Sequence, residues 1–216
     1  MNFRRAQRIR HWLIGPAAAL LFCCACGWAM AQEAIGAVSR VQGEASRTGG
    51  GATQALRLNA PVFLHDVVST GEGARLEVTL ADSSRLTLGE KAKLTLDRYV
   101  FDPAADSGTI RIEVVGAFRF VSGKVSKLAN SAVSAVTPIA AVGIRGTDFW
   151  AGPIDNQALG VLLIEGAVSV ANAAGEQLLS QPGQGTNIAA AGAAPGPVTF
   201  WPQDKVNRAL AAVTFR

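Results

Sequence analysis

Residues 74–88 read ARLEVTLADSSRLTL, and this stretch decides the fold class. Apolar and polar residues alternate along residues 74–80, give way to a short polar interruption, and alternate again along residues 85–88. Alternation with a period of two places one set of side chains on one face of a strand. The interruption at residues 81–84 has the composition of a tight turn. The stretch therefore predicts an antiparallel hairpin that buries Leu76, Val78 and Leu80.

Strand patterns continue on the C-terminal side of this hairpin. Residues 109–115 alternate, with Ile110, Ile112 and Val114 on one face, and Phe118-Arg119-Phe120 resumes the pattern. Residues 160–170 are more uniformly apolar, which is typical of a strand buried on both faces. Stretches rich in glycine, proline or small polar residues predict loops at residues 47–54, 102–108 and 189–197.

A recurring glycine pattern bears on the architecture. The pattern [Val/Ile]-x-Gly-x-[Ala/Val]-Ser occurs at residues 41–46, 121–126 and 164–169. A glycine within a strand marks a bulge, a corner or a close backbone approach, and repeated corners are typical of stacked β-coils. Coincidence is the alternative explanation. The predicted fold is all-β, either a stacked, solenoid-like β-coil or a twisted two-sheet sandwich. A short helix is expected from Pro202 to Val213.

The first 31 residues have the layout of a secretory signal. Four arginines precede an apolar run at residues 12–30, and Ala29-Met30-Ala31 fits a cleavage site before Gln32. Because the run is long enough to span a bilayer, an uncleaved membrane anchor is the alternative. We expect a signal peptide over residues 1–31, an all-β domain over 32–190, and a linker with a helix over 191–216. The expected location is periplasmic or secreted.

Composition limits the chemistry of the mature chain. All three cysteines lie within the first 31 residues, so no disulfide or thiol chemistry is expected. Four of the 20 basic residues lie there too, which leaves 16 basic against 16 acidic residues. Such a neutral chain lacks the charge excess of a nucleic-acid-binding protein. We expect no nucleic-acid partner, and a membrane partner only if the N-terminal segment is uncleaved.

Groups suited to catalysis or metal binding are sparse. His65 is the only histidine beyond residue 31. Neighbours in a strand point to opposite faces, so His65 and Asp66 are poorly placed as base and orienting acid, and His65 is expected in a turn or on the surface. No metal or cofactor is expected. The remaining enzyme class is a carboxylate-based polysaccharide hydrolase using two of Asp66, Asp82, Asp97 and Asp148. We expect a non-catalytic protein.

A charged knot interrupts the apolar residues 133–150. In the sequence GIRGTDF at residues 143–149, two glycines flank Arg145 and an acid follows. Unpaired buried charges are strongly destabilising. We therefore expect a bidentate ion pair of Arg145 with Asp148, Glu165 or Asp155 across a turn at Gly146, or an arginine presented to an anionic ligand or a partner's carboxylate. Arg145, Thr147 and Asp148 are the candidate ligand- or partner-binding residues.

Short elements in order along residues 35–190 resemble the FecR-domain family of extracytoplasmic bacterial proteins. The matching stretches are residues 36–38 with Gly43, 66–71 (DVVSTG), 80–84 (LADSS), 137–138 (TP), 143–149, 160–170 and 182–185 (PGQG). Ser83 replaces the glycine of the family's Asp-Gly-Ser turn, so a difference in backbone type is expected there. By the resemblance, the structural motif comprises Asp66, Thr70, Asp82, Thr137, Pro138, Gly143, Gly146 and Phe149.

The resemblance implies an all-β, extracytoplasmic and non-catalytic domain. In the family's best-known members, such a domain relays a signal from an outer-membrane receptor to a sigma factor inside the cell. We expect an exported module that binds or scaffolds a cell-envelope protein or ligand of unidentified nature. The alternative is a membrane-tethered signalling regulator that keeps an uncleaved N-terminal anchor.

Overall fold

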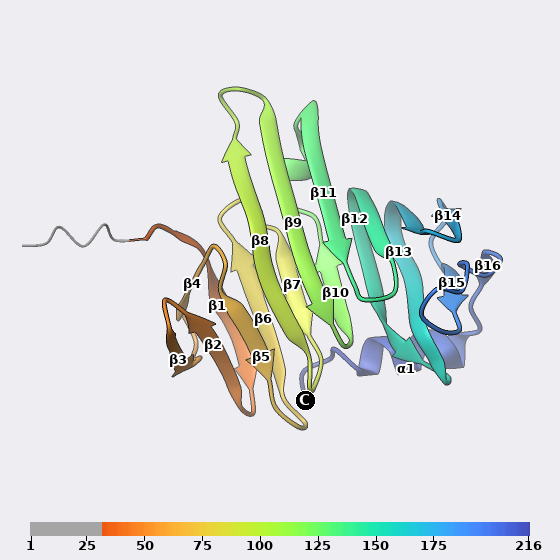
Figure 1. Cartoon of the computed structure of the whole chain (residues 1–216), viewed down its shortest axis with the longest axis horizontal. Helices are drawn as coiled ribbons and strands as arrows, with labels where there is room; N and C mark the ends of the chain where they lie inside the picture. Colours follow the sequence, from red (N-terminus) through yellow and green to blue (C-terminus); the bar gives the residue numbers. More distant parts are fainter. Residues whose placement is uncertain (1–31) are drawn as a thin grey trace, which may run out of the picture. The chain divides into compact units, whose positions relative to one another are not determined.

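One continuous sheet of 16 strands dominates the computed structural model, which describes residues 32–216 (Figure 1). The strands are β1 (Ala34–Gln42), β2 (Ala45–Gly49), β3 (Ala52–Ala55), β4 (Pro61–Phe63), β5 (Val67–Thr70), β6 (Arg75–Leu80), β7 (Arg85–Leu88), β8 (Lys93–Asp102), β9 (Ser107–Val115), β10 (Phe118–Val121), β11 (Asn130–Val136), β12 (Ala141–Ile154), β13 (Gln157–Asn172), β14 (Gly175–Leu179), β15 (Gln184–Ile188) and β16 (Thr199–Phe200). A 3-10 turn, η1 (Val125–Lys127), and one helix, α1 (Gln203–Ala211), are also present. The predicted all-β class with a short C-terminal helix is confirmed. The expected signal peptide and its cleavage site lie outside the described residues.

The sheet is doubled over into two layers. The first layer has the strand order β3-β2-β5-β8-β9-β11, and the second has the order β10-β7-β6-β1-β4 (Figure 1). β12 joins them, because residues 141–144 pair with β11 whereas residues 148–151 pair with β10. β13 pairs with β12 along both parts. The main hydrophobic core draws buried side chains from both layers.

The chain passes repeatedly between the layers, and the recurring glycines lie where it does so. Gly43 adopts φ 72° between β1 of the second layer and β2 of the first. Gly166 adopts φ 85° inside β13, and Gly123 follows β10, where a Cβ atom would clash with the backbone of residues 82–84. The pattern therefore marks corners and close approaches. The fold combines the two layers of a sandwich with the winding of a coil.

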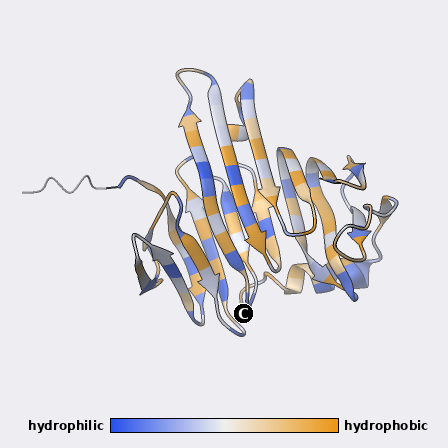
Figure 2. Cartoon of the chain, in the orientation of Figure 1, coloured by the Kyte–Doolittle hydropathy of each residue, from blue (hydrophilic) through white to orange (hydrophobic). Residues whose placement is uncertain are grey.

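The predicted hairpin is formed by β6 and β7, which pair antiparallel around the turn at residues 81–84. Its inward side chains Leu76, Val78 and Leu80 are buried. Figure 2 shows the same alternation of hydropathy along β8 and β9. In β13, residues 159–163 are continuously buried as expected, but Glu165 and Gly166 are exposed. The uniform burial ends there because β13 turns from one layer to the other.

Residues 47–54, predicted as a loop, instead form most of the β2–β3 hairpin. Gly50 and Gly51 both have positive φ, 58° and 81°. Two successive residues in the left-handed region form a hairpin turn whose twist matches that of the paired strands. The run of three glycines at residues 49–51 therefore connects β2 to β3 in place of the expected loop. His65 lies in a turn with φ 67°, exposed, as predicted. Helix α1 begins after Pro202, as the sequence indicated.

Candidate functional site

The charged knot of the sequence is the corner at which β12 passes between the layers. The register between β12 and β13 shifts between Arg145 and Asp148, and Gly146 adopts φ 56° there. On the facing strand, a Cβ atom at Gly166 would clash with the Gly146 carbonyl oxygen. The two backbones meet so closely that only glycine fits at position 166 without a shift of the backbone.

Thr147 holds this corner together. Its side chain is 3% exposed. The Thr147 hydroxyl donates to the carbonyl of Ala167 at 3.1 Å and accepts the backbone N–H of Arg145 at 3.2 Å. The backbone N–H of Thr147 donates to Ser122 Oγ at 2.9 Å, and the N–H of Ser122 donates back to the Thr147 carbonyl. Thr147 thus ties β12 to β13 and to the end of β10.

Asp148 pairs with Arg119 of β10, so the expected ion pair between Arg145 and Asp148 is wrong. Arg119 Nε donates to Asp148 Oδ1 at 2.8 Å, and Nη2 donates to Oδ2 at 2.5 Å. These hydrogen bonds raise the pKa of the Arg119 guanidinium above its usual range. Asp148 lies opposite Val121 in the β10–β12 ladder, so Arg119, two residues from Val121, is its diagonal neighbour. Spacing along the sequence does not reveal such a neighbour, because it depends on which strands pair.

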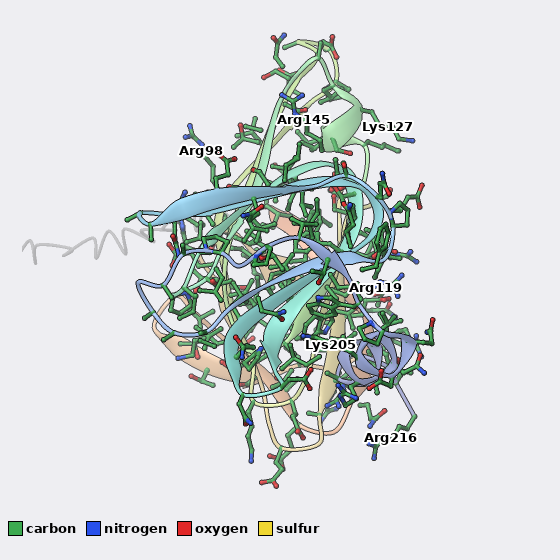
Figure 3. All side chains as sticks on the ribbon, turned by 90° about the vertical axis from the view of Figure 1, so that its right-hand side faces the viewer. Arg98, Arg119, Lys127, Arg145, Lys205 and Arg216 are labelled. Carbon is green, nitrogen blue, oxygen red and sulfur yellow. The ribbon has the colours of Figure 1, made fainter. Side chains whose placement is uncertain are left out.

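Arg145 is left exposed by the same corner. Within residues 32–216, Arg145 forms no ion pair, so neither Asp155 nor Glu165 is its partner. Asp155 instead contacts Lys205 and Arg208 at 3.5 and 3.0 Å. Figure 3 displays Arg145 well apart from Arg119 and Lys205. The bulge places Arg145 and Asp148 in different layers, so their side chains cannot form an ion pair.

A trough of about 760 Å³ lies beside Arg145 on the outer side of the first layer. Side chains of β11, β12, β13 and β14, together with the segment at η1, line it. Most of them are small, including Ser134, Gly143 and Ser169, and Leu178 forms an exposed apolar rim. Arg145 is the single ionisable residue among those lining the trough. The trough therefore offers one guanidinium next to hydroxyl groups and small side chains.

Phe149 belongs to the core. Its ring meets Phe118 edge to face, with centroids 5.7 Å apart at 83°, and lies 6.1 Å from the ring of Phe120. All three rings are fully buried. Edge-to-face pairs of this kind add to the stabilisation from burial. The aromatic residues around the knot therefore pack the region where β10 and β12 run together.

Asp66 and Thr70 secure the two ends of β5. Asp66 Oδ2 accepts Arg47 Nη1 at 3.0 Å and the backbone N–H of Phe63 at 2.9 Å. The Thr70 hydroxyl donates to the Gly89 carbonyl at 2.7 Å and accepts the N–H of Ala92 at 3.0 Å. Both side chains are buried. The polar side-chain atoms of Asp66 and Thr70 are therefore engaged in hydrogen bonds that stabilise turns.

Asp82 fastens the β6–β7 turn to the segment that leads into η1. Its carboxylate accepts the Ser84 N–H at 3.1 Å, the Ser84 hydroxyl at 2.7 Å and the N–H of Val125 at 3.1 Å. The backbone N–H of Asp82 donates to the Tyr99 hydroxyl at 2.8 Å. Burial, together with the charge of Asp82, raises the pKa of Tyr99 to about 12. Ser83 adopts φ 72°, so the serine keeps a glycine-like backbone.

The remaining motif residues shape the β11–β12 connection. The Thr137 hydroxyl accepts the backbone N–H groups of Ile139 and Ala140 at 3.2 and 3.0 Å and donates to the Ala140 carbonyl. Pro138 lies exposed within this turn. At Gly143, a Cβ atom would come within 2.7 Å of Ser169 Oγ, in the floor of the trough. Gly143 thus keeps the trough open beside Arg145.

The four acids considered for hydrolysis have separate partners. Asp66 pairs with Arg47, Asp97 with Arg111 at 2.8 Å, and Asp148 with Arg119, while Asp82 is fully buried in its turn. Within residues 32–216, no group of three or more His, Cys, Asp or Glu side chains could hold a metal ion. No helix within residues 32–216 is both long enough and apolar enough to span a membrane.

Known proteins resemble this chain in the sequence of its middle part and in fold. The model of the family described as FecR protein matches residues 66–169, a range that contains every motif residue placed above. Two crystal structures described as a "putative anti-sigma factor" from Parabacteroides distasonis ATCC 8503, at 1.65 and 2.50 Å resolution, are similar. Both have a TM-score of 0.53, with 19% and 18% sequence identity, over 67% of this chain.

The chain spans 64% and 63% of the length of those two solved chains, and at such identity the likeness shows the fold alone. A comparison with curated proteins found no match. The family match covers the corner of β12, the turns held by Asp66 and Asp82, and the arginine beside the trough. The chain therefore contains a FecR domain, which the family model matches over residues 66–169.

Proposed function

We propose that this chain is a FecR-like signalling regulator of the cell envelope that works by binding another protein and catalyses no reaction. The observation that carries the proposal is the contrast within the motif at residues 143–149. Thr147 and Asp148 are engaged internally, whereas Arg145 is exposed and has no ion-pair partner in residues 32–216. The likeness of fold to the Parabacteroides protein supports a regulatory role.

The trough beside Arg145 is the proposed contact surface. A guanidinium binds a carboxylate through two parallel hydrogen bonds, and the hydroxyls of Ser134 and Ser169 can bind backbone groups of a partner. The rim at Leu178 adds apolar area, its side chain being 64% exposed. Arg145 is therefore the contact residue in this proposal. Thr147 and Asp148 act indirectly by fixing the corner that presents it.

The internal partners of the carboxylates support a non-catalytic role. Glycoside hydrolysis needs two carboxyl groups that face one substrate, about 5–10 Å apart. Asp66 and Asp82 instead lie in turns beside β5 and β6, and Asp148 lies within β12, each with its own donors. Carboxylates whose lone pairs are already used for structure are poorly suited to act as acid and nucleophile.

Residues 1–31 determine how the regulator is held in the envelope. We propose that the chain is exported and cleaved before Gln32. The alternative, an anchor that is retained, predicts a different N-terminal residue in the isolated protein. N-terminal sequencing of the protein isolated from the envelope should start at Gln32. A start at residue 1 or 2 would favour the membrane-tethered regulator.

The binding role is tested by crosslinking and co-purification from the native envelope. Arg145→Ala should lose its crosslinked partner protein. Arg98→Ala is the matched control, since Arg98 is also exposed, lies in β8 of the same layer and makes no ion pair within residues 32–216. If the Arg145→Ala protein is folded and retains every partner, the contact proposed here is wrong.

A further inference from the structure

The trough on the outer side of the first layer has a floor of small side chains between two rims. In the strand register, Ser134 of β11, Gly143 of β12 and Ser169 of β13 lie side by side across the sheet. The flanking strands carry longer, exposed side chains at the same level, Arg111 on β9 and Leu178 on β14. The floor is therefore three strands wide, and the strands from β9 to β14 that frame it are seen in Figure 1.

Charges on this face are divided between its two ends. Arg145 lies at the end of the trough nearest η1. At the other end, one cross-strand row consists of Glu113, Val136, Ala141, Ala171 and Glu176. Arg145, Glu113 and Glu176 are exposed, and none of them forms an ion pair within residues 32–216. Since Ala141 and Arg145 are four positions apart on β12, the basic and acidic ends are about 13 Å apart.

The backbone beneath the trough is paired within the sheet, and this restricts what can lie on it. Residues 141–144 of β12 pair with β11 on one side and with β13 on the other. An extended segment on this face would keep its own N–H and C=O groups unpaired against small side chains, whereas a helix pairs them internally. The hydroxyls of Ser134 and Ser169 can satisfy a few groups, such as the free carbonyls in the last turn of a helix, but not those of a whole strand.

A helix also fits the width of the floor. The backbones of β9 and β14 are four strand spacings apart, or about 19 Å. A helix with its side chains is about 10–12 Å across, which leaves room for the side chains of the two rims. A single extended strand is about 5 Å wide and would leave most of the floor uncovered.

We propose that the partner docks an amphipathic helix along β12, with small apolar residues on the floor, a carboxylate at Arg145 and a basic side chain between Glu113 and Glu176. Since this docking assumes that the trough is the contact surface, it rests on the proposed function. Helix positions i and i+7 share a face and lie about 10.5 Å apart, close to the separation of the charged ends. The helix dipole favours the basic residue first, because the positive N-terminal end then lies near the two glutamates and the negative C-terminal end near the guanidinium.

The probe is a synthetic alanine- and leucine-based helical peptide of about 16 residues that carries a lysine and, seven positions later, a glutamate. In the control peptide, of the same composition, the glutamate is moved two positions further, to the opposite side of the helix. The probe should bind the purified protein at least about tenfold more tightly than the control in fluorescence anisotropy, and should gain helical circular dichroism on binding. Equal affinities, or absence of binding, would overturn the docked helix.

Charge reversal identifies the residues that the probe contacts. Arg145→Glu should weaken probe binding about tenfold, and a probe with arginine in place of its glutamate should restore it. The double variant Glu113→Lys and Glu176→Lys should weaken binding of the original probe to a similar extent. Glu44→Lys is the matched control, since Glu44 is exposed, precedes β2 of the same layer and forms no ion pair within residues 32–216. Failure of the arginine probe to restore binding would contradict the contact at Arg145.

Co-purification from the native envelope separates the docked helix from the proposed function. The partner protein should be lost with Arg145→Ala and with the double lysine variant, and kept with Glu44→Lys. Loss with Arg145→Ala but retention with the double variant would overturn a helix that spans both charged ends, while the trough would remain the contact surface. Retention of the partner by both variants would overturn the proposed function as well.

Discussion

Gly146 and Gly166 face each other across β12 and β13, with the Gly146 carbonyl oxygen in the space that a Cβ atom on Gly166 would need. Both residues have positive φ, 56° and 85°. At Gly146 the space around a Cβ atom is open, whereas at Gly166 it is filled by backbone. The corner therefore tolerates a side chain on one strand far better than on the other.

This asymmetry predicts different costs for two alanine substitutions. Gly146→Ala should lower the free energy of unfolding by about 1 kcal/mol, the cost of a left-handed alanine. Gly166→Ala should lower it by about 2–5 kcal/mol, because backbone strain and a clash add. Urea unfolding followed by circular dichroism measures both. Equal costs would mean that the close approach of the two strands does not limit the corner.

The ion pair of Arg119 and Asp148 predicts a contrast between two arginines. Arg119→Ala leaves the buried carboxylate of Asp148 without its bidentate partner and should cost about 1–3 kcal/mol of stability. Arg145→Ala removes an exposed side chain and should stay within about 0.5 kcal/mol of the unmodified protein. Chemical denaturation of the two variants compares them. A larger loss for Arg145→Ala would mean that Arg145 supports the fold.

Local patterns in the sequence predict individual strands and hairpins, but not which distant strands pair. Alternation predicted the hairpin of β6 and β7 because local burial dictates which face each residue takes. The partner of Asp148 was missed because Arg119 lies 29 residues earlier, and only the strand order brings β10 beside β12. The signal was present in Phe118-Arg119-Phe120, where a charge interrupts two core aromatics. The glycine pattern showed where the chain bends, but not which layers it joins.

Ser83 offers a stabilising substitution. It adopts φ 72° in the β6–β7 turn, and its side chain is exposed. Ser83→Gly should raise the free energy of unfolding by about 0.5–1 kcal/mol, since relief of left-handed strain outweighs the added freedom of the unfolded chain. Ser83→Ala keeps the strain and serves as the control, with no gain expected. Thermal unfolding distinguishes them, and a loss in Ser83→Gly would show that the serine side chain contributes to the turn.

Tyr99 predicts a limit to stability at alkaline pH. Its pKa rises from 10.0 to about 12 in the folded protein, mainly through burial and secondarily through the charge of Asp82. A raised folded pKa means that the stabilisation is complete below pH about 10 and is lost as the pH rises through 12. Tyr99 is the only tyrosine of the chain, so the ultraviolet absorbance of the phenolate reports it alone. Tyr99→Phe should flatten the loss of stability, and ionisation near pH 10 would contradict the burial argument.

The sharing of β12 and β13 by both layers has a consequence for folding. The first layer needs residues 141–144 to cover β11, and the second needs residues 148–151 to cover β10. Neither layer can be completed before the chain has been synthesised through β13, which ends at Asn172. A nascent chain would therefore remain without a finished core until late, and the domain should gain its structure in one cooperative step. Such delayed folding suits the export proposed above, in which the polypeptide would cross the membrane before it folds.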